Sequence, residues 1–175
     1  MSEFTIRLAR PGDAADFFRV EDDAAELLRS EPLLEGIPIP PTTTADHHAK
    51  VIAMRRSLTA LVGDEIVGFA ESGQVGRELH LHEMSVARAH QGRGIGMTLL
   101  RALKIDARNS GFRAITLNTF RDVPWNAPFY ARHGFVEVTE FEGRPHLAQS
   151  LASAVELGIP AETRCAMICF LDQAS

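Results

Sequence analysis

Three glycines at alternate positions stand at the start of a predicted helix, in the segment Gln91-Gly92-Arg93-Gly94-Ile95-Gly96. Amides at a helix N-terminus bind phosphate, and glycines let the backbone approach a ligand closely. A P-loop would need Gly-Lys-Ser/Thr, whereas Gly96 is followed by Met97-Thr98. A Rossmann fingerprint would need its third glycine at Met97, and no acid follows at the right distance. The loop therefore predicts phosphate binding of another kind, and the alternative is a glycine-rich turn before an ordinary helix.

The charge of the chain is unevenly distributed. Its net charge of −5 argues against nucleic acid as a main partner. Between residues 85 and 108, however, five basic residues outnumber a single acid, which gives this stretch a net charge of +4. A local positive field in an acidic protein suits a small anionic ligand better than a polyanion.

The length and composition are typical of one soluble globular domain, which we expect to span residues 1–175. The chain has no apolar run of about 18 residues, and its N-terminus lacks the apolar stretch of a signal peptide. We therefore expect a cytoplasmic protein without a membrane partner. Cys165 and Cys169 are too few for a disulfide framework and lack a second ligand pair for zinc, so we expect buried thiols and no metal.

The elements that must position the glycine loop follow from hydrophobic periodicity and turn residues. A proline-rich loop of restricted flexibility is expected at 31–41. Hairpins in the first half and a β-α-β crossover in the middle imply an α/β (α+β) fold, with a mixed, largely antiparallel sheet of about seven strands covered by helices. The predicted strands are 4–8, 58–62, 66–71, 78–86, 114–120, 135–141 and 164–171, and the predicted helices are 13–29, 44–56, 94–110, 127–133 and 146–157.

Two motifs together resemble the GNAT superfamily of N-acetyltransferases. The segment 86–96, Val-Ala-Arg-Ala-His-Gln-Gly-Arg-Gly-Ile-Gly, is similar to the superfamily's acetyl-CoA signature after a valine-ended strand. The segment 126–135, Asn-Ala-Pro-Phe-Tyr-Ala-Arg-His-Gly-Phe, resembles its second motif. The motifs occur in the expected order, and the element order fits over roughly residues 3–171. One departure is Arg88, which stands where proline is common.

The resemblance implies acetyl-CoA as the co-substrate. The strand end at 84–86 would pair with the pantetheine arm through its backbone, and the amides of 91–96 would hold the pyrophosphate. Asn126 would contact the cofactor arm where two central strands splay, and Arg132 is either near the adenosine phosphate or a surface arginine. The implied cofactor-binding residues are Met84, Ser85, Val86, Gln91, Gly92, Arg93, Gly94, Ile95, Gly96, Thr98, Asn126, Phe129, Tyr130 and Arg132.

The resemblance also implies direct attack of an amine on the thioester in a ternary complex, without an acyl-enzyme. Tyr130 is the candidate general acid for the departing thiolate, because a phenol is neutral at pH 7 and donates a hydrogen bond; the alternative is a core aromatic. The candidate bases are His82, Glu83 and His80, in that order, and the His-x-His pair is similar to arylalkylamine N-acetyltransferases. Strand alternation places both histidines on one face and Glu83 on the other, unless a bulge re-aims Glu83.

The acceptor is expected near the first two helices, their proline-rich connector and the segment after Phe135. Small amines, amino acids, peptide N-termini and lysines all remain open as acceptors. The acidic residues within 21–26 either attract a cationic amine or form a solvated helix face. Trp125 either lines the pocket or anchors its loop, and His47-His48 is expected at the surface. A non-catalytic acyl-CoA sensor and a transferase that uses another acyl-CoA are the alternatives, and homodimers are common in the superfamily.

Overall fold

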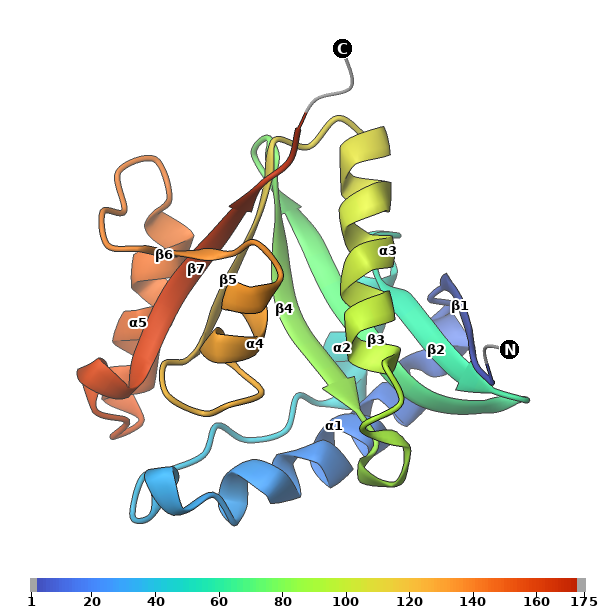
Figure 1. Ribbon diagram of the computed structural model, residues 1–175, viewed down its shortest axis with the longest axis horizontal. Helices are drawn as coiled ribbons and strands as arrows, with labels where there is room; N and C mark the ends of the chain where they lie inside the picture. The colour runs from blue at the N-terminus through green and yellow to red at the C-terminus, as the bar shows by residue number, and fades with distance from the viewer. Residues whose placement is uncertain (1–2, 173–175) are drawn as a thin grey trace.

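The computed structural model describes residues 3–172, which form a seven-stranded sheet with helices on both faces (Figure 1). The strand order is β1-β2-β3-β4-β5-β7-β6. The strands are β1 (Thr5–Leu8), β2 (Leu58–Val62), β3 (Glu65–Val75), β4 (Glu78–Val86), β5 (Ala114–Phe120), β6 (Val136–Val138) and β7 (Arg164–Phe170). The α-helices are α1 (Ala14–Arg29), α2 (Ala45–Ile52), α3 (Ile95–Asn109), α4 (Ala127–Arg132) and α5 (Pro145–Glu156).

The sheet is antiparallel except at its centre, where β4 and β5 run parallel and are joined by the α3 crossover. Within the described chain, β4 and β5 pair only at Leu79–Ile115 and His80–Thr116. Beyond these pairs the two strands diverge, as Figure 1 shows. The predicted mixed, largely antiparallel sheet is thus confirmed, and its central strands are closed at one end and open at the other.

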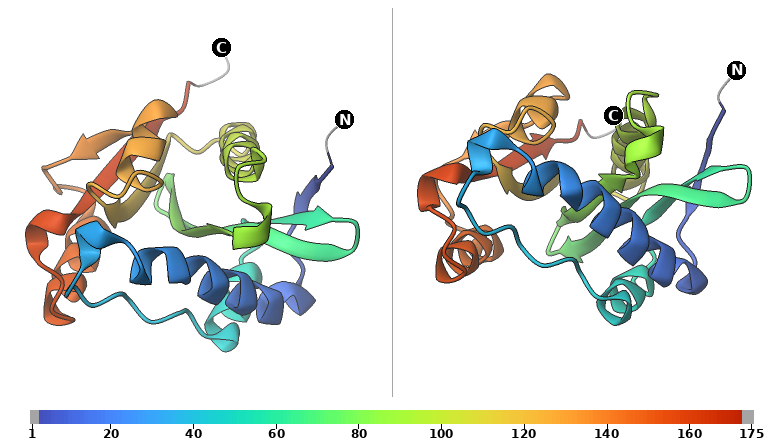
Figure 2. Two further views of the ribbon diagram at one scale, coloured as in Figure 1. Left: turned by 60° about the horizontal axis from the view of Figure 1, so that its bottom comes forward. Right: turned by 90° about the horizontal axis from the view of Figure 1, so that it is seen from below.

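The helices form two layers. Helices α3 and α4 cover one face of the sheet, and α1, α2 and α5 cover the other (Figures 1 and 2). None of the helices described between residues 3 and 172 is long and apolar enough to cross a membrane.

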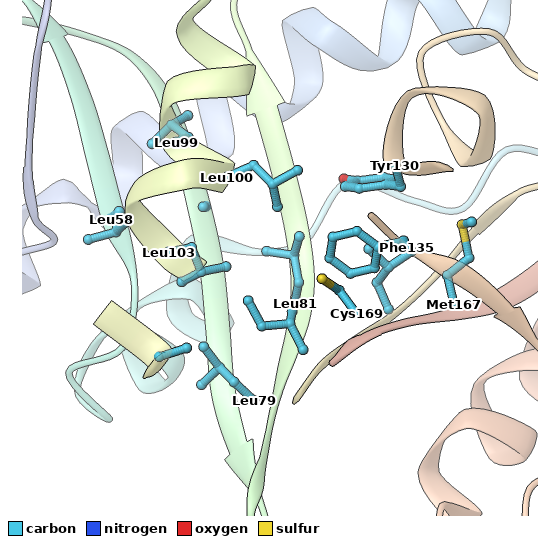
Figure 3. Close-up of a cluster of buried hydrophobic side chains, with 14 of the residues drawn as sticks. Leu58, Leu79, Leu81, Leu99, Leu100, Leu103, Tyr130, Phe135, Met167 and Cys169 are labelled. Carbon is cyan, nitrogen blue, oxygen red and sulfur yellow. The ribbon is translucent and has the colours of Figure 1, made fainter. Parts of the chain in front are cut away.

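The main core lies between α3 and the sheet (Figure 3). Helix α3 buries one apolar stripe, because its leucines recur at helical spacing, and each buried leucine contributes about 1.5–3 kcal/mol relative to an exposed one. The predicted burial of Cys165 and Cys169 as free thiols is confirmed. The fully buried leucines of this cluster are Leu79, Leu99, Leu100, Leu103 and Leu117.

Three element boundaries differ from the sequence prediction. Strand β3 continues to Val75, since it pairs with β4 up to the tight turn at Gly76, whose φ is 60°. Helix α2 ends at Ile52, and the chain then reverses through Arg55, whose φ is 63°. Strand β6 has three residues because it lies at the sheet edge and pairs with β7 alone. Polar and apolar patterning alone does not reveal the ends of β3 and β6, because pairing with neighbouring strands sets them.

Candidate functional site

A cavity of about 620 Å³ opens where β4 and β5 diverge. Its walls come from β4 residues 81–86, β5 residues 117–120, the glycine loop, and the start of α4. Helix α1 and connector residues 39–43 close the other side. The predicted place of the proline-rich connector beside the site therefore agrees with the structure, whereas none of the described residues 136–163 lines the cavity.

The glycine loop presents free amides at this cavity. Gly92 and Gly94 have φ values of 74° and 81°, in the left-handed region that favours glycine. The amide of Thr98 donates to the carbonyl of Gly94, so the preceding amides at the start of α3 have no acceptor within the helix. The side chain of Gln91 donates to the carbonyl of Val86 (2.9 Å) and holds the loop against the end of β4. Such a concave set of amides at a helix N-terminus fits a phosphate group.

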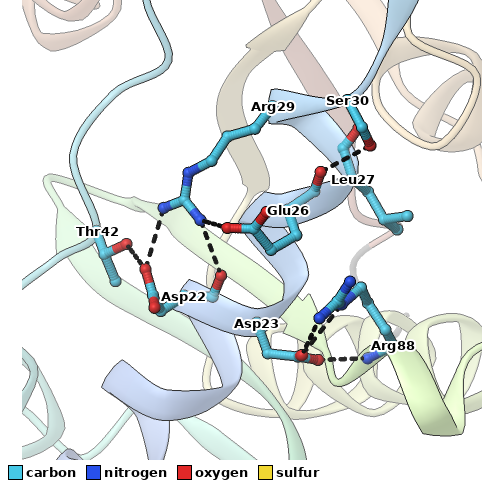
Figure 4. A network of polar contacts seen from close by, with 8 residues as sticks. All are labelled: Asp22, Asp23, Glu26, Leu27, Arg29, Ser30, Thr42 and Arg88. Atoms are coloured by element: carbon cyan, nitrogen blue, oxygen red, sulfur yellow. Dashed lines mark hydrogen bonds and ion pairs between the residues drawn. The ribbon is translucent and has the colours of Figure 1, made fainter.

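Helix α1 supports the loop through Arg88, the residue that replaces the common proline (Figure 4). The backbone amide of Arg88 donates to Asp23 (2.7 Å), and its guanidinium donates to the same carboxylate (3.0 Å). Asp22 and Glu26 both bind Arg29, so these carboxylates form ion pairs on an exposed helix face. The acidic run thus matches the solvated-face alternative, except at its first residue.

That first residue, Glu21, belongs to a buried cluster with His48 and Glu71. The His48 ring binds Glu21 through Nε2 (2.8 Å) and Glu71 through Nδ1. Burial alone would lower the pKa of His48, but the hydrogen bonds to Glu21 and Glu71 outweigh it and raise this pKa to about 9. The expectation of a surface position is wrong for His48, which is fully buried, although His47 is exposed. The missed signal was Glu71, an acid inside an apolar strand that required a buried partner.

A β-bulge at His82 decides which side chains enter the cavity. Glu71 pairs with Glu83 and Ser72 pairs with Leu81, so His82 is the extra residue of β4. The bulge shifts the alternation, and Glu83 joins Ser85 and Glu71 on the face that α1 covers. Strict alternation, which places Glu83 on the face opposite the histidines, therefore does not hold, and the bulged alternative does.

The cavity environment shifts Glu83 and His82 toward their neutral forms. Desolvation, reinforced by the neighbouring Glu21, raises the pKa of Glu83 to about 8. Ser85 Oγ donates to Glu83 Oε1 (2.9 Å) and partly opposes this shift. Desolvation also lowers the pKa of His82, which lines the cavity beside Glu83. At neutral pH, His82 is thus an unprotonated candidate base, and Glu83 becomes one as the pH approaches 8.

His80, the third candidate base, lies away from the cavity lining. Its Nδ1 is 2.9 Å from Thr116 Oγ1, and its ring packs against His82 and His146 with centroids 5.0 and 5.1 Å apart. Desolvation, with a smaller effect of the two neighbouring histidines, lowers the pKa of His80 to about 3. The structure therefore brings His82 and Glu83 into the cavity and leaves His80 at the paired end of β4 and β5.

Tyr130 reaches the cavity from α4 and is 8% exposed. Desolvation and the charge of Glu83 raise the pKa of Tyr130, so its hydroxyl stays protonated and available as a donor. Asn126 is the N-cap residue of α4 and accepts a hydrogen bond from Thr119 Oγ1 (2.6 Å), which holds its side chain at the cavity wall. Phe129 and Trp125 line the same wall.

The cavity lining differs from the predicted cofactor-binding residues at several positions. Arg93, Thr98 and Arg132 do not line the cavity, and the Thr98 hydroxyl donates to the Gly94 carbonyl (2.8 Å) inside the helix. In contrast, Asn118 and Arg164 line the cavity although the sequence prediction did not include them. Asn118 lies within the apolar strand β5, and Arg164 is the first residue of the apolar strand β7. A polar residue at such a position does not show by its sequence context whether it lines a cavity. Within residues 3–172, no cluster of three or more His, Cys, Asp or Glu side chains is arranged to hold a metal ion.

Comparisons with known proteins agree with this architecture. The family model described as the acetyltransferase (GNAT) family matches residues 22–135. Among solved structures, the Escherichia coli ribosomal-protein-S18-alanine N-acetyltransferase has a TM-score of 0.70 at 18% identity, over 98% of this chain and 96% of that one. PaiA N-acetyltransferase from Thermoplasma acidophilum, in complex with coenzyme A, has a TM-score of 0.70 at 15% identity, over 95% and 98% of the two chains. YncA from Salmonella typhimurium, solved with acetyl-CoA, has a TM-score of 0.68 at 18% identity, over 98% and 96%.

Proposed function

The chain belongs to the acetyltransferase (GNAT) family, and from this premise we propose that it transfers the acetyl group of acetyl-CoA directly to a primary amine. One observation carries the proposal: free amides of a glycine loop lie at the mouth of a cavity that the diverging β4 and β5 hold open. Coenzyme A or acetyl-CoA is present in the related structures of PaiA and YncA, which supports the same co-substrate here.

The co-substrate would bind along the open edge of β4. The amides of residues 91–96 would hold the pyrophosphate, with the dipole of α3 favouring its negative charge. Past His80 the β5-facing edge of β4 has no partner strand in the described chain, so the backbone of residues 84–86 is available to the pantetheine arm. Asn126, fixed by Thr119, would contact that arm from the opposite wall. A backbone amide near Val86 would polarise the thioester carbonyl.

Acid and base would stand on opposite walls of the cavity. Tyr130 would donate its proton to the thiolate sulfur of coenzyme A as the carbon–sulfur bond breaks, because its raised pKa keeps the phenol protonated. Glu83 would take the proton from the acceptor amine, because a pKa of about 8 makes its carboxylate a stronger base than an ordinary carboxylate. His82 is the second candidate for the base. Attack in a ternary complex needs no acyl-enzyme, and positioning would supply much of the rate.

The test combines thiol release with calorimetric titration of acetyl-CoA, using a broad panel of primary amines. We expect micromolar binding of acetyl-CoA and thiol release that depends on the amine. In Gly96→Glu the new carboxylate would stand among the loop amides and abolish binding; an added Cβ there meets no atom closer than 4.0 Å, so the fold should persist. Gly12→Glu is the matched control, since Gly12 has open space and is exposed.

Tyr130→Phe separates binding from turnover. This variant should bind acetyl-CoA as the natural protein does, while kcat falls by about 10- to 100-fold. Failure of the protein to bind any acyl-CoA would refute the proposal. Tight binding without turnover on any amine would instead favour the sensor alternative, and faster release from a longer acyl-CoA would favour another acyl donor.

A further inference from the structure

Arg164 is an arginine without a counter-ion in the cavity wall. It begins β7, opposite Phe120 of β5, and its guanidinium lies 4.8 Å from the centre of the Phe120 ring. Its Nε is buried and has no hydrogen-bond partner. Among residues 3–172, the Arg164 side chain donates no hydrogen bond and forms no ion pair. Its neighbour Arg121 differs, since it binds Glu137 through two contacts of 2.6 and 2.8 Å.

The protein itself supplies little negative charge to Arg164. Desolvation lowers the pKa of its guanidinium, and the charge of Glu83 is the main effect that opposes this shift. At neutral pH, however, Glu83 is largely protonated, because its own pKa is raised to about 8. A half-buried cation with neutral surroundings is costly unless a ligand brings an anion to it.

A second buried group without a partner lies on the same wall. Asn118 Oδ1 has no hydrogen-bond partner, although Asn118 Nδ2 donates to the carbonyl of Leu147 (3.3 Å). Asn118 and Phe120 are two residues apart on β5, and Phe120 pairs with Arg164, so all three point to one face of the sheet. One wall of the cavity thus presents an unpaired cationic donor and an unpaired acceptor.

This wall belongs to the side of the sheet that faces away from α3. Phe120 packs in the cluster of Leu34, Ala154 and Ile159, which come from the connector region and the α5 end of the chain. The glycine loop leads into α3 on the other face (Figure 2). A ligand that reaches Arg164 therefore enters beside the α1–α2 connector, where the sequence predicts the acceptor.

We propose that Arg164 binds the carboxylate of the acceptor, so the acceptor is a small molecule that carries an amine and a carboxylate, namely a free amino acid. The inference rests on the proposed acetyl transfer. The ammonium group of the amino acid would lie between Glu83 and Asn118 Oδ1, and Glu83 in its ionised form would receive the proton. The apolar cavity residues Leu28, Ile39 and Pro40 favour an apolar side chain. The guanidinium of Arg164 then gains a charged acceptor that can take two parallel N–H···O hydrogen bonds.

The experiment compares three forms of the same acceptor at saturating acetyl-CoA. Leucine, methionine and phenylalanine are each tested beside their carboxamides and their decarboxylated amines, with thiol release as the readout. The carboxamides stand in for a peptide N-terminus. We expect kcat/KM to be about 10- to 100-fold higher for the free amino acids, the range of a charge-assisted hydrogen-bonded pair. Equal or better use of the carboxamides or amines would overturn the inference while leaving acetyl transfer intact.

Arg164→Met tests the residue directly. This variant should lose most of the preference for the carboxylate form over the carboxamide and the decarboxylated amine, and keep its KM for acetyl-CoA. Arg121→Met is the matched control, because Arg121 does not line the cavity and contacts Arg164 only at its backbone carbonyl (3.3 Å). Persistence of the preference in Arg164→Met would overturn the inference.

Calorimetric titration of the amino acids in the presence of coenzyme A provides a readout that does not need turnover. Binding that Arg164→Met abolishes and Arg121→Met preserves would support a carboxylate site, even if transfer were not seen. Absence of amino-acid binding to the natural protein would contradict it. Thermal unfolding of both variants verifies that the fold is kept.

Discussion

Buried titratable residues lie at both ends of β4, but only one end opens into the cavity. At the paired end, His80 is enclosed by Thr116, His82 and His146, and its pKa falls to about 3. At the open end, Glu83 lines a cavity of about 620 Å³ and its pKa rises to about 8. Burial favours the neutral form in both places, so the pKa shifts alone do not distinguish them. Access distinguishes them, because a ligand reaches the residue at the open end only.

The largest effect should come from removing His48, the buried cation that binds Glu21 in the cavity wall at the open end of β4. His48→Gln would leave Glu21 and Glu71 buried without a positive charge, and we expect the free energy of unfolding at pH 7 to fall by about 3–5 kcal/mol. His47→Gln, an exposed neighbour, should change it by less than about 0.5 kcal/mol. Urea unfolding followed by circular dichroism measures both. A loss below about 1 kcal/mol in His48→Gln would contradict a stabilising charge pairing in this cluster.

The same cluster predicts how stability depends on pH. The pKa of His48 is raised from an ordinary 6.5 to about 9, so the folded state holds this proton more tightly than the unfolded state. Its stabilisation is complete below pH 6.5 and is lost as the pH rises through 9. The raised pKa of Glu83 acts in the same direction between pH 4.5 and about 8. Unfolding curves across this range should show a decline that is shallower in His48→Gln.

The second effect concerns the base at the open end. Glu83→Gln keeps the size of the side chain but accepts no proton, and kcat/KM for the amine should fall by about 100-fold. In the natural protein the rate should rise with pH through about 8 as Glu83 ionises, and this ascending limb should disappear in the variant. His82→Gln is measured in parallel. A larger loss there, with Glu83→Gln nearly unaffected, would assign the base to His82.

The smallest effect is expected at the paired end. His80→Gln should change kcat/KM by less than about threefold, since His80 does not line the cavity. Its cost should appear in stability, at about 1–2 kcal/mol, because the hydrogen bond to Thr116 and the ring packing are lost. Steady-state rates and urea unfolding of one preparation provide both numbers. A loss of activity as large as that of Glu83→Gln would remove the functional difference between the two ends.

Local chemistry explains what the sequence could predict. Hydrophobic periodicity located the strands and helices, and the glycine loop indicated a phosphate site, because these signals depend on residues close together in the chain. The same holds for Tyr130 and Asn126, which lie together in one short motif and both line the cavity. Their roles in binding and catalysis stay predictions.

The sequence by itself determined the order of the elements, the apolar stripe of α3 and the loop that begins it. Only the tertiary structure decided the bulge at His82, which turns Glu83 toward the cavity, and the burial of His48 between two carboxylates. The tertiary structure also places Arg164 in the cavity wall without a counter-ion. These features depend on the register between strands and on contacts between residues tens of positions apart. Such contacts leave no periodic signal in the chain, because each partner reads locally as an ordinary polar residue.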